Sequence, residues 1–268
     1  MKLDLQAGSP HKLGAHYDGE GTNFAVFSEN ATQIDLCIFS KDGKTELVQC
    51  ALPERTGSIW HGYAPDLKPG ALYGFRAHGA YEPEQGHRFN PNKLLMDPYT
   101  REVHGSWVND DATLGYDAKE EEDEDLSFSS VDSAPFVPKS VVSDPELFKV
   151  LERKPGDWDD TLIYEAHVKG LTQEHPEVPD NLKGTYEGLA SDAVIDHLKK
   201  LGITTVELLP VHHFIDESFL QNKGLTNYWG YNTIGFFAPE PRYLGPQGLL
   251  GFKKMVQRFH DAGIEVVL

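Results

Sequence analysis

Residues 202–232 decide the fold, and they read Gly202-Ile-Thr-Thr-Val-Glu-Leu-Leu-Pro-Val-His-His-Phe214, a polar loop, and then Asn227-Tyr-Trp-Gly-Tyr-Asn232. Ile203–Leu209 is a β-branched and aliphatic run that is typical of a strand, and Pro210 ends it because proline has no backbone donor. In α/β proteins, ligands bind in the loops that follow the carboxyl ends of the strands. The sequence therefore predicts a binding loop after this strand.

The loop contains three aromatic residues, Tyr228, Trp229 and Tyr231, with Gly230 among them. Flat rings beside a strand end suit a ligand with apolar faces and hydroxylated edges, such as a sugar. Large aromatic side chains are also usually mostly buried, so core packing is the alternative interpretation. Composition leaves both open.

The segments around this strand repeat one pattern. Thr161–Val168 is predicted to be a strand, and a helix follows from a cap at Ser191 or Asp192, with apolar residues at helical spacing. A second helical stripe over 249–262 leads to a strand at 264–268. Strand, helix, strand, helix, strand opens either a (β/α)₈ barrel or a doubly wound sheet, and periodicity does not choose between them.

Residues 8–105 are predicted to be all β. Thr22–Ser28 and Gln33–Phe39 alternate polar and apolar residues, and short strands follow with turns at 41–44 and 68–70. Such spacing favours a β-sandwich. Residues 106–157 are polar and rich in proline, and we interpret them as a connector whose acidic run at 120–125 is a solvated loop.

Charge and composition exclude several partners. The 268 residues contain 42 Asp and Glu against 24 Lys and Arg, a formal charge of -18, which repels phosphate backbones and anionic lipid but not a neutral glucan. We therefore expect no nucleic-acid and no membrane partner. Cys37 and Cys50 read as buried free thiols, and without an apolar leader or membrane span the simplest interpretation is a cytoplasmic protein.

The motif at 227–239 (Asn-Tyr-Trp-Gly-Tyr-Asn-Thr-Ile-Gly-Phe-Phe-Ala-Pro), together with 202–212, resembles the second-strand region of isoamylase-type glycogen debranching enzymes of glycoside hydrolase family 13. The resemblance covers nearly the whole chain. It implies an N-terminal immunoglobulin-like β-sandwich, similar to a carbohydrate-binding module, over 8–105, and the start of a (β/α)₈ catalytic barrel over 158–268.

The resemblance also implies a function. Enzymes of this family cleave glucosidic bonds with retention, using a nucleophilic carboxylate and a carboxylic acid close together across the bond. In the family these groups follow strands four, five and seven, whereas this sequence stops at Leu268, inside the third. We therefore expect the N-terminal portion of an α-1,6-glucosidase acting on branch linkages of glycogen or another branched α-glucan. We expect no catalytic residue in this chain, no hydrolysis by the chain alone, and no cofactor.

Tyr231 has the clearest role by resemblance, as the ring that stacks on the glucose whose bond is cut. Tyr228 and Trp229 are interpreted as neighbours that shape the loop, and His212 as a residue lining the same cleft. Local carboxylates offer alternatives: Glu165 and Glu207 lie in predicted strands, and Glu207 is expected in a buried polar network. His212, His213 and Asp216 could suggest a metal site, but no further spaced ligand supports it, and we predict none.

Two other functions stay open. One is a different isoamylase-type hydrolase, acting on maltooligosyl-trehalose or amylopectin. The other is a non-catalytic glucan-binding fragment that keeps the sandwich and the aromatic loop.

Overall fold

The computed structural model describes residues 3–120, 124–145, 149, 156 and 158–268. Part of the acidic run expected at 120–125, and most of residues 146–157 at the end of the expected connector, lie outside these ranges. The chain divides into two compact units, one of residues 1–144 and 216–226 and the other of residues 145–215 and 227–268.

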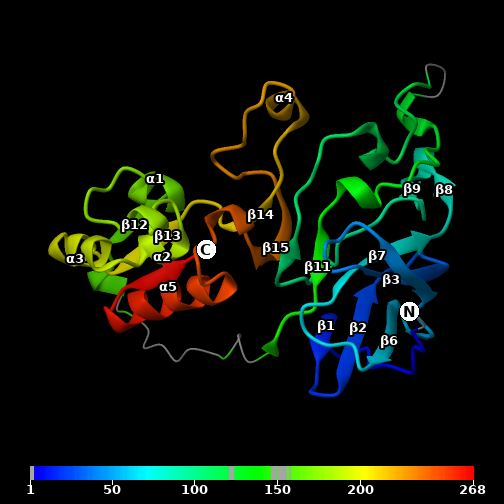
Figure 1. Ribbon diagram of the computed structural model, residues 1–268, viewed down its shortest axis with the longest axis horizontal. Helices are drawn as coiled ribbons and strands as arrows, with labels where there is room; N and C mark the ends of the chain where they lie inside the picture. The colour runs from blue at the N-terminus through cyan, green and yellow to red at the C-terminus, as the bar shows by residue number, and fades with distance from the viewer. Residues whose placement is uncertain (1–2, 121–123, 146–148, 150–155, 157) are drawn as a thin grey trace. The chain divides into compact units, whose positions relative to one another are not determined.

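The first unit is a sandwich of two antiparallel sheets, which confirms the predicted architecture (Figure 1). One sheet has the order β1-β2-β6-β5, with bounds Gly14–Tyr17, Gly21–Phe27, Ile59–Pro65 and Glu54–Thr56. The other has the order β10-β11-β7-β3-β4, with bounds Val103–His104, Lys139–Val141, Leu72–His78, Gln33–Phe39 and Glu46–Ala51. A two-stranded pair, β8 (Tyr81–Glu82) and β9 (His87–Arg88), lies outside these sheets.

Alternation along the strands builds the core between the sheets. Phe24 and Val26 of β2 pack with Leu36 of β3 and Tyr73 and Phe75 of β7, and all are buried. The Phe24 and Tyr73 rings meet edge to face at 5.0 Å between centroids, an arrangement that aromatic pairs favour. Hydrophobic burial of this kind is the main source of the unit's stability.

The opposite face of the second sheet is covered by later residues. Cys37, Phe39 and Leu72 form a second apolar cluster with Leu94 and with residues of the segment expected as a connector, namely Ala134, Val137 and Val141. The same segment supplies β11, which pairs antiparallel with β7. The sandwich therefore draws part of its second sheet from residues beyond 105.

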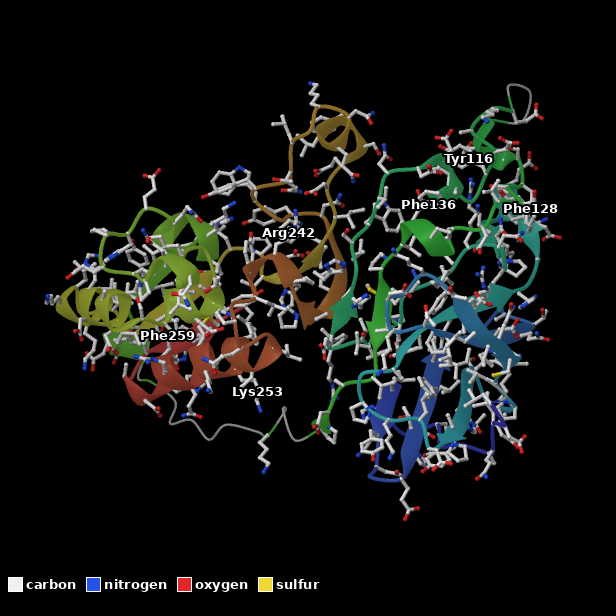
Figure 2. All side chains as sticks on the ribbon, viewed as in Figure 1. Tyr116, Phe128, Phe136, Arg242, Lys253 and Phe259 are labelled. Atoms are coloured by element: carbon white, nitrogen blue, oxygen red, sulfur yellow. The ribbon has the colours of Figure 1, made fainter. Side chains whose placement is uncertain are left out.

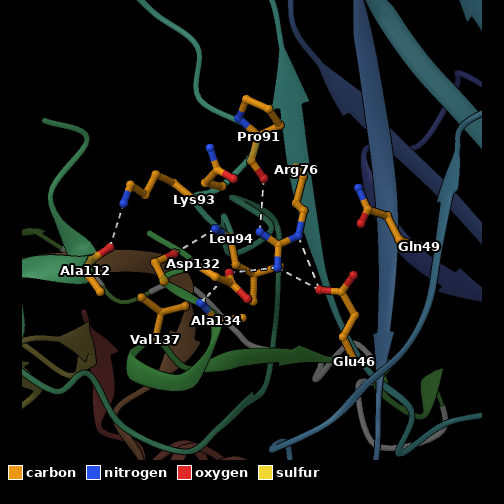
Figure 3. A network of polar contacts seen from close by, with 12 residues as sticks. Glu46, Gln49, Arg76, Pro91, Lys93, Leu94, Ala112, Asp132, Ala134 and Val137 are labelled. Atoms are coloured by element: carbon orange, nitrogen blue, oxygen red, sulfur yellow. Dashed lines mark hydrogen bonds and ion pairs between the residues drawn. The ribbon is translucent and has the colours of Figure 1, made fainter. Parts of the chain in front are cut away.

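Buried cations hold this polar segment to the sandwich (Figure 3). The Arg76 guanidinium donates to Glu46 Oε2 at 2.7 Å, to Asp132 Oδ1 at 2.9 Å and to the Pro91 carbonyl at 3.0 Å. Lys93 Nζ donates to the Ala112 carbonyl, Ser129 Oγ and the Val131 carbonyl at 2.9, 2.9 and 2.7 Å. A buried ammonium is tolerated only with such partners, and burial still lowers the pKa of Lys93.

The second unit contains a parallel sheet with the order β12-β13-β16, with bounds Ile163–Ala166, Thr205–Leu208 and Glu265–Val267. These strands confirm the three predicted ones. Ile163 aligns with Thr205, and Thr205 with Glu265, both in parallel register. The connections contain α1 (Val168–Thr172), α2 (Tyr186–Leu189), α3 (Asp192–Lys200) and α5 (Leu249–Asp261).

Both predicted helices pack most of their apolar stripe against the core. On α3, Val194, Ile195 and Leu198 face the core, and Gly202 just beyond the helix has φ 76°, which an L side chain rarely adopts. On α5, Met255 and Phe259 are completely buried in the same cluster. Figure 2 labels Phe259 on this helix. No helix in the described part of the chain is long and apolar enough to cross a bilayer.

Candidate functional site: an aromatic arm beside a parallel sheet

A twisted ribbon extends from the carboxyl end of β13. It consists of β14 (His212–Phe214) and β15 (Thr233–Pro239), paired antiparallel with irregular register. Between them the chain passes through α4 (Ser218–Gln221), which belongs to the first unit, and returns at Asn227. We call residues 228–231, with their three aromatic rings, the aromatic arm.

The turn within the arm depends on Gly230. Its φ is 83°, and its N–H donates to Asn227 Oδ1 at 2.8 Å. A Cβ added there would lie 2.8 Å from Phe214 Cε1 and 3.1 Å from Pro210 Cβ. Glycine is therefore required both for its backbone conformation and for its close approach to the ribbon.

Tyr228 is seated on His167, the residue that follows β12. The two rings stack with 4.2 Å between centroids and 4° between planes. His167 Nε2 lies 2.7 Å from the Tyr228 carbonyl oxygen and 3.3 Å from Tyr243 Oη. The arm from the second strand is therefore attached to the carboxyl end of the first.

Exposure separates the three rings. Tyr228, Trp229 and Tyr231 are 45%, 58% and 71% exposed. One face of Tyr228 is taken by His167, and Trp229 stands edge-on to Tyr228 with 5.4 Å between centroids. Tyr231 therefore presents the most accessible ring, and none of the three is an ordinary core aromatic.

His212 lies elsewhere on the ribbon. Its ring is half-buried and tilted against Phe236, with 6.4 Å between centroids, and burial lowers its pKa. A neutral imidazole is thus favoured at this position. The ring contact described for His212 is with β15 rather than with the arm.

A buried network of polar and charged side chains stabilises the β14–β15 ribbon. Glu240, 1% exposed, accepts from Phe214 N and pairs with His213 Nδ1, both at 3.1 Å through Oε2. Its Oε1 accepts from Arg242 Nε at 2.7 Å. The Arg242 guanidinium also lies over the Phe214 ring, 4.1 Å from its centroid.

Two opposing effects act on the pKa of Glu240 in this network. Desolvation raises the pKa of Glu240, but hydrogen bonds from His213 and Arg242 more than offset it, so the pKa lies below its usual value and the carboxylate is ionised. Burial, and secondarily the Glu240 charge, raises the pKa of Tyr243 to about 12. Tyr243 therefore keeps its proton beside His167 at neutral pH.

The local carboxylates of the second unit lie in strands of the parallel sheet and not in the arm. Glu165 and Glu207 are both exposed on the parallel sheet, so the expectation of a buried polar network for Glu207 is wrong. Asp216 and Glu217 belong to the first unit. Among the described residues, no three His, Cys, Asp or Glu side chains come together as a possible metal site.

Sequence reasoning missed four residues that support the arm and its ribbon. They are His167, Gly170, Glu240 and Tyr243, which lie up to 76 residues from their partners along the chain. One signal was available for His167, because it directly follows a predicted strand, where ligand loops begin. The others carry no local signal.

A match to a family model gives the domain class of the first unit. Residues 12–100 match carbohydrate-binding module 48, described as the isoamylase N-terminal domain. The β-sandwich and the expected module-like N-terminal region therefore agree with a recognised domain class.

Curated relatives match nearly the whole chain. It is 48% identical over 270 residues to a glycogen debranching enzyme of Yersinia pestis, covering 98% of this chain and 39% of that protein. It is 46% identical over 266 residues to a glycogen operon protein GlgX homolog of Mycobacterium bovis, covering 97% of this chain and 36% of that protein. The chain is thus similar to glycogen debranching enzymes, and it spans little more than a third of these relatives' length.

Solved structures share the fold. A pullulanase from Paenibacillus barengoltzii in complex with maltohexaose and alpha-cyclodextrin superposes with a TM-score of 0.68 at 20% identity, covering 96% of this chain and 37% of that one. The catalytic module of the glycogen-degrading pneumococcal virulence factor SpuA gives 0.69 at 22% identity, covering 97% and 37%.

Proposed function

We propose that these residues form part of a glycogen debranching enzyme that hydrolyses α-1,6-glucosidic branch linkages. The observation that carries the proposal is the 48% identity to a protein named glycogen debranching enzyme, with 46% identity to a glycogen operon protein, over almost every residue of the chain. The parallel strands β12, β13 and β16, with helices in the connections, are the opening of its (β/α)₈ barrel. The sandwich is its carbohydrate-binding-type module.

The aromatic arm is the part of the substrate site that this chain provides. Its position after β13 puts it at the carboxyl end of a parallel sheet, where barrel enzymes bind substrate. Tyr231 supplies the face on which a glucose ring stacks. Tyr228 and Trp229 shape the arm, and His212, on the ribbon that carries the arm, faces the same substrate. The partner is therefore a branched α-glucan.

A chimera tests the proposal. Residues 1–268 replace the matching region of the Yersinia pestis relative, and reducing ends released from glycogen are measured. We expect debranching at a rate within about tenfold of the parent, because a shared fold and shared substrate contacts preserve transition-state binding. Residues 1–268 alone serve as the control and are expected to release nothing. A chimera that unfolds cooperatively and yet debranches no glucan would contradict the proposal.

A further inference from the structure

His167 has both ring nitrogens committed. It is the N-cap of α1, and its Nδ1 accepts from the Gly170 N–H at 2.9 Å. An acceptor nitrogen carries no proton, so the ring proton of the neutral imidazole lies on Nε2. His167 is 8% exposed, which keeps water from competing for either nitrogen.

The protonated Nε2 is directed at the arm. With the Tyr228 carbonyl at 2.7 Å it makes a short N–H···O bond, and Tyr243 Oη at 3.3 Å is a second, weaker neighbour. The stacked ring of Tyr228 adds a second contact to the same residue. The absence of a side chain at Gly170 leaves room for Tyr228, because a Cβ there would lie 2.5 Å from Tyr228 Oη.

The attachment point is close to the ring proposed to meet substrate. Tyr228 and Tyr231 are three residues apart, which is at most about 11 Å of extended chain. Gly230, between them, has a backbone that is already constrained by its Asn227 bond. Fixing the Tyr228 carbonyl therefore fixes the direction in which Tyr231 leaves the sheet.

We propose that His167 is a positioning residue: its neutral, Nε2-protonated imidazole ties the carboxyl end of β12 to the aromatic arm and orients Tyr231 toward an α-glucan. The glucan part rests on the proposed function. The ordering of the arm does not, since it follows from contacts present without any ligand.

Two isosteric amides separate the two bonds of His167. In His167→Asn, the amide oxygen takes the place of Nδ1 and keeps the cap on Gly170, but the side chain is too short to reach Tyr228. In His167→Gln, the amide nitrogen reaches the position of Nε2 and keeps the bond to Tyr228, but the cap is lost. If His167 only caps the helix, only His167→Gln should alter the chain. If His167 positions the arm, His167→Asn should loosen the arm.

Chymotrypsin reports on the arm, because it cleaves after aromatic residues. Cleavage sites in the whole 268-residue chain are mapped by mass spectrometry over time. We expect His167→Asn to speed cleavage after Tyr228, Trp229 and Tyr231 about tenfold, with sites in the sandwich unchanged, and His167→Gln to restore slow cleavage there. In parallel, electrophoresis in gels that contain glycogen measures binding as retarded migration. We expect the His167→Asn chain to lose this retardation and the His167→Gln chain to recover it. The ¹⁵N spectrum of the wild-type chain gives a third reading: a pyrrole-like Nε2 and a pyridine-like Nδ1.

The outcomes separate the two ideas. Unchanged cleavage of the arm in a folded His167→Asn chain would overturn the positioning role, and so would a wild-type spectrum with the proton on Nδ1, which needs no variant to fold. Faster cleavage in Asn together with no glycogen retardation of the wild-type chain would support positioning and count against the proposed function alone.

Discussion

Tyr231 is the residue on which the proposed substrate contact depends. Its ring is 71% exposed, so its removal costs the fold little, whereas a sugar would lose a stacking face worth about 1 kcal/mol. We expect Tyr231→Ala to weaken glycogen affinity roughly fivefold to tenfold while the melting temperature changes by about 2 °C or less. Tyr231→Phe keeps the face and should bind like the wild type. Equal affinity in the Ala variant would remove Tyr231 from the site.

Glu240, in contrast to Tyr231, has a structural role, because its carboxylate is buried and ionised. Because its pKa is lowered from 4.5 in the folded state, its stabilisation is complete above the pKa of the unfolded carboxyl and is lost as the pH falls through the lower folded value. Glu240→Gln leaves Arg242 without its counter-charge and puts a neutral amide opposite the His213 ring and the Phe214 N–H. We expect a loss of about 2–4 kcal/mol in the free energy of unfolding at pH 7, shrinking toward low pH.

Urea unfolding at a series of pH values measures this difference. Exposed Glu174 provides a matched control, and Glu174→Gln should leave the free energy of unfolding within about 0.5 kcal/mol of the wild type at every pH. A Glu240→Gln chain whose deficit is the same at pH 7 and at acid pH would contradict an ionised carboxylate in the folded state.

At the scale of elements, the sandwich is completed by β11 and by the apolar residues around it. Residues 134–141 cover Cys37, Phe39 and Leu72 on the outer face of β3 and β7. We therefore expect a fragment of residues 1–144 to unfold cooperatively, and a fragment of residues 1–105 to have a lower melting temperature and to bind a hydrophobic dye through the uncovered face. Calorimetry and dye fluorescence test this. Equal melting temperatures would mean that the outer face needs no cover.

At the scale of the molecule, charge separates a neutral polymer from an anionic one. The formal charge of -18 disfavours polyanions, while stacking and hydrogen bonds to a glucan involve no net charge. We expect glycogen affinity to change by less than about twofold between low and high salt, and we expect no retention on DNA or anionic vesicles at physiological ionic strength. A glycogen affinity that falls steeply with salt would show that charged groups dominate binding.

The sequence by itself determined the elements and their order. Alternation at Thr22–Ser28 and Gln33–Phe39 predicted sandwich strands, and the helical stripes predicted α3 and α5, because burial of one face repeats with the period of the backbone. It also located the aromatic residues and their strand end. These features depend on near neighbours along the chain, which the sequence displays directly.

Only the tertiary structure decided which side chains support one another. The contact of His167 with Tyr228 joins residues 61 positions apart, and that of His213 with Glu240 joins residues 27 apart. Periodicity shows which face of a strand is buried but not which distant residue lies against it. The exposure of Glu207 and the pairing of residues 139–141 with the sandwich were missed for the same reason. Both depend on which distant segments of the folded chain pack against a given sheet.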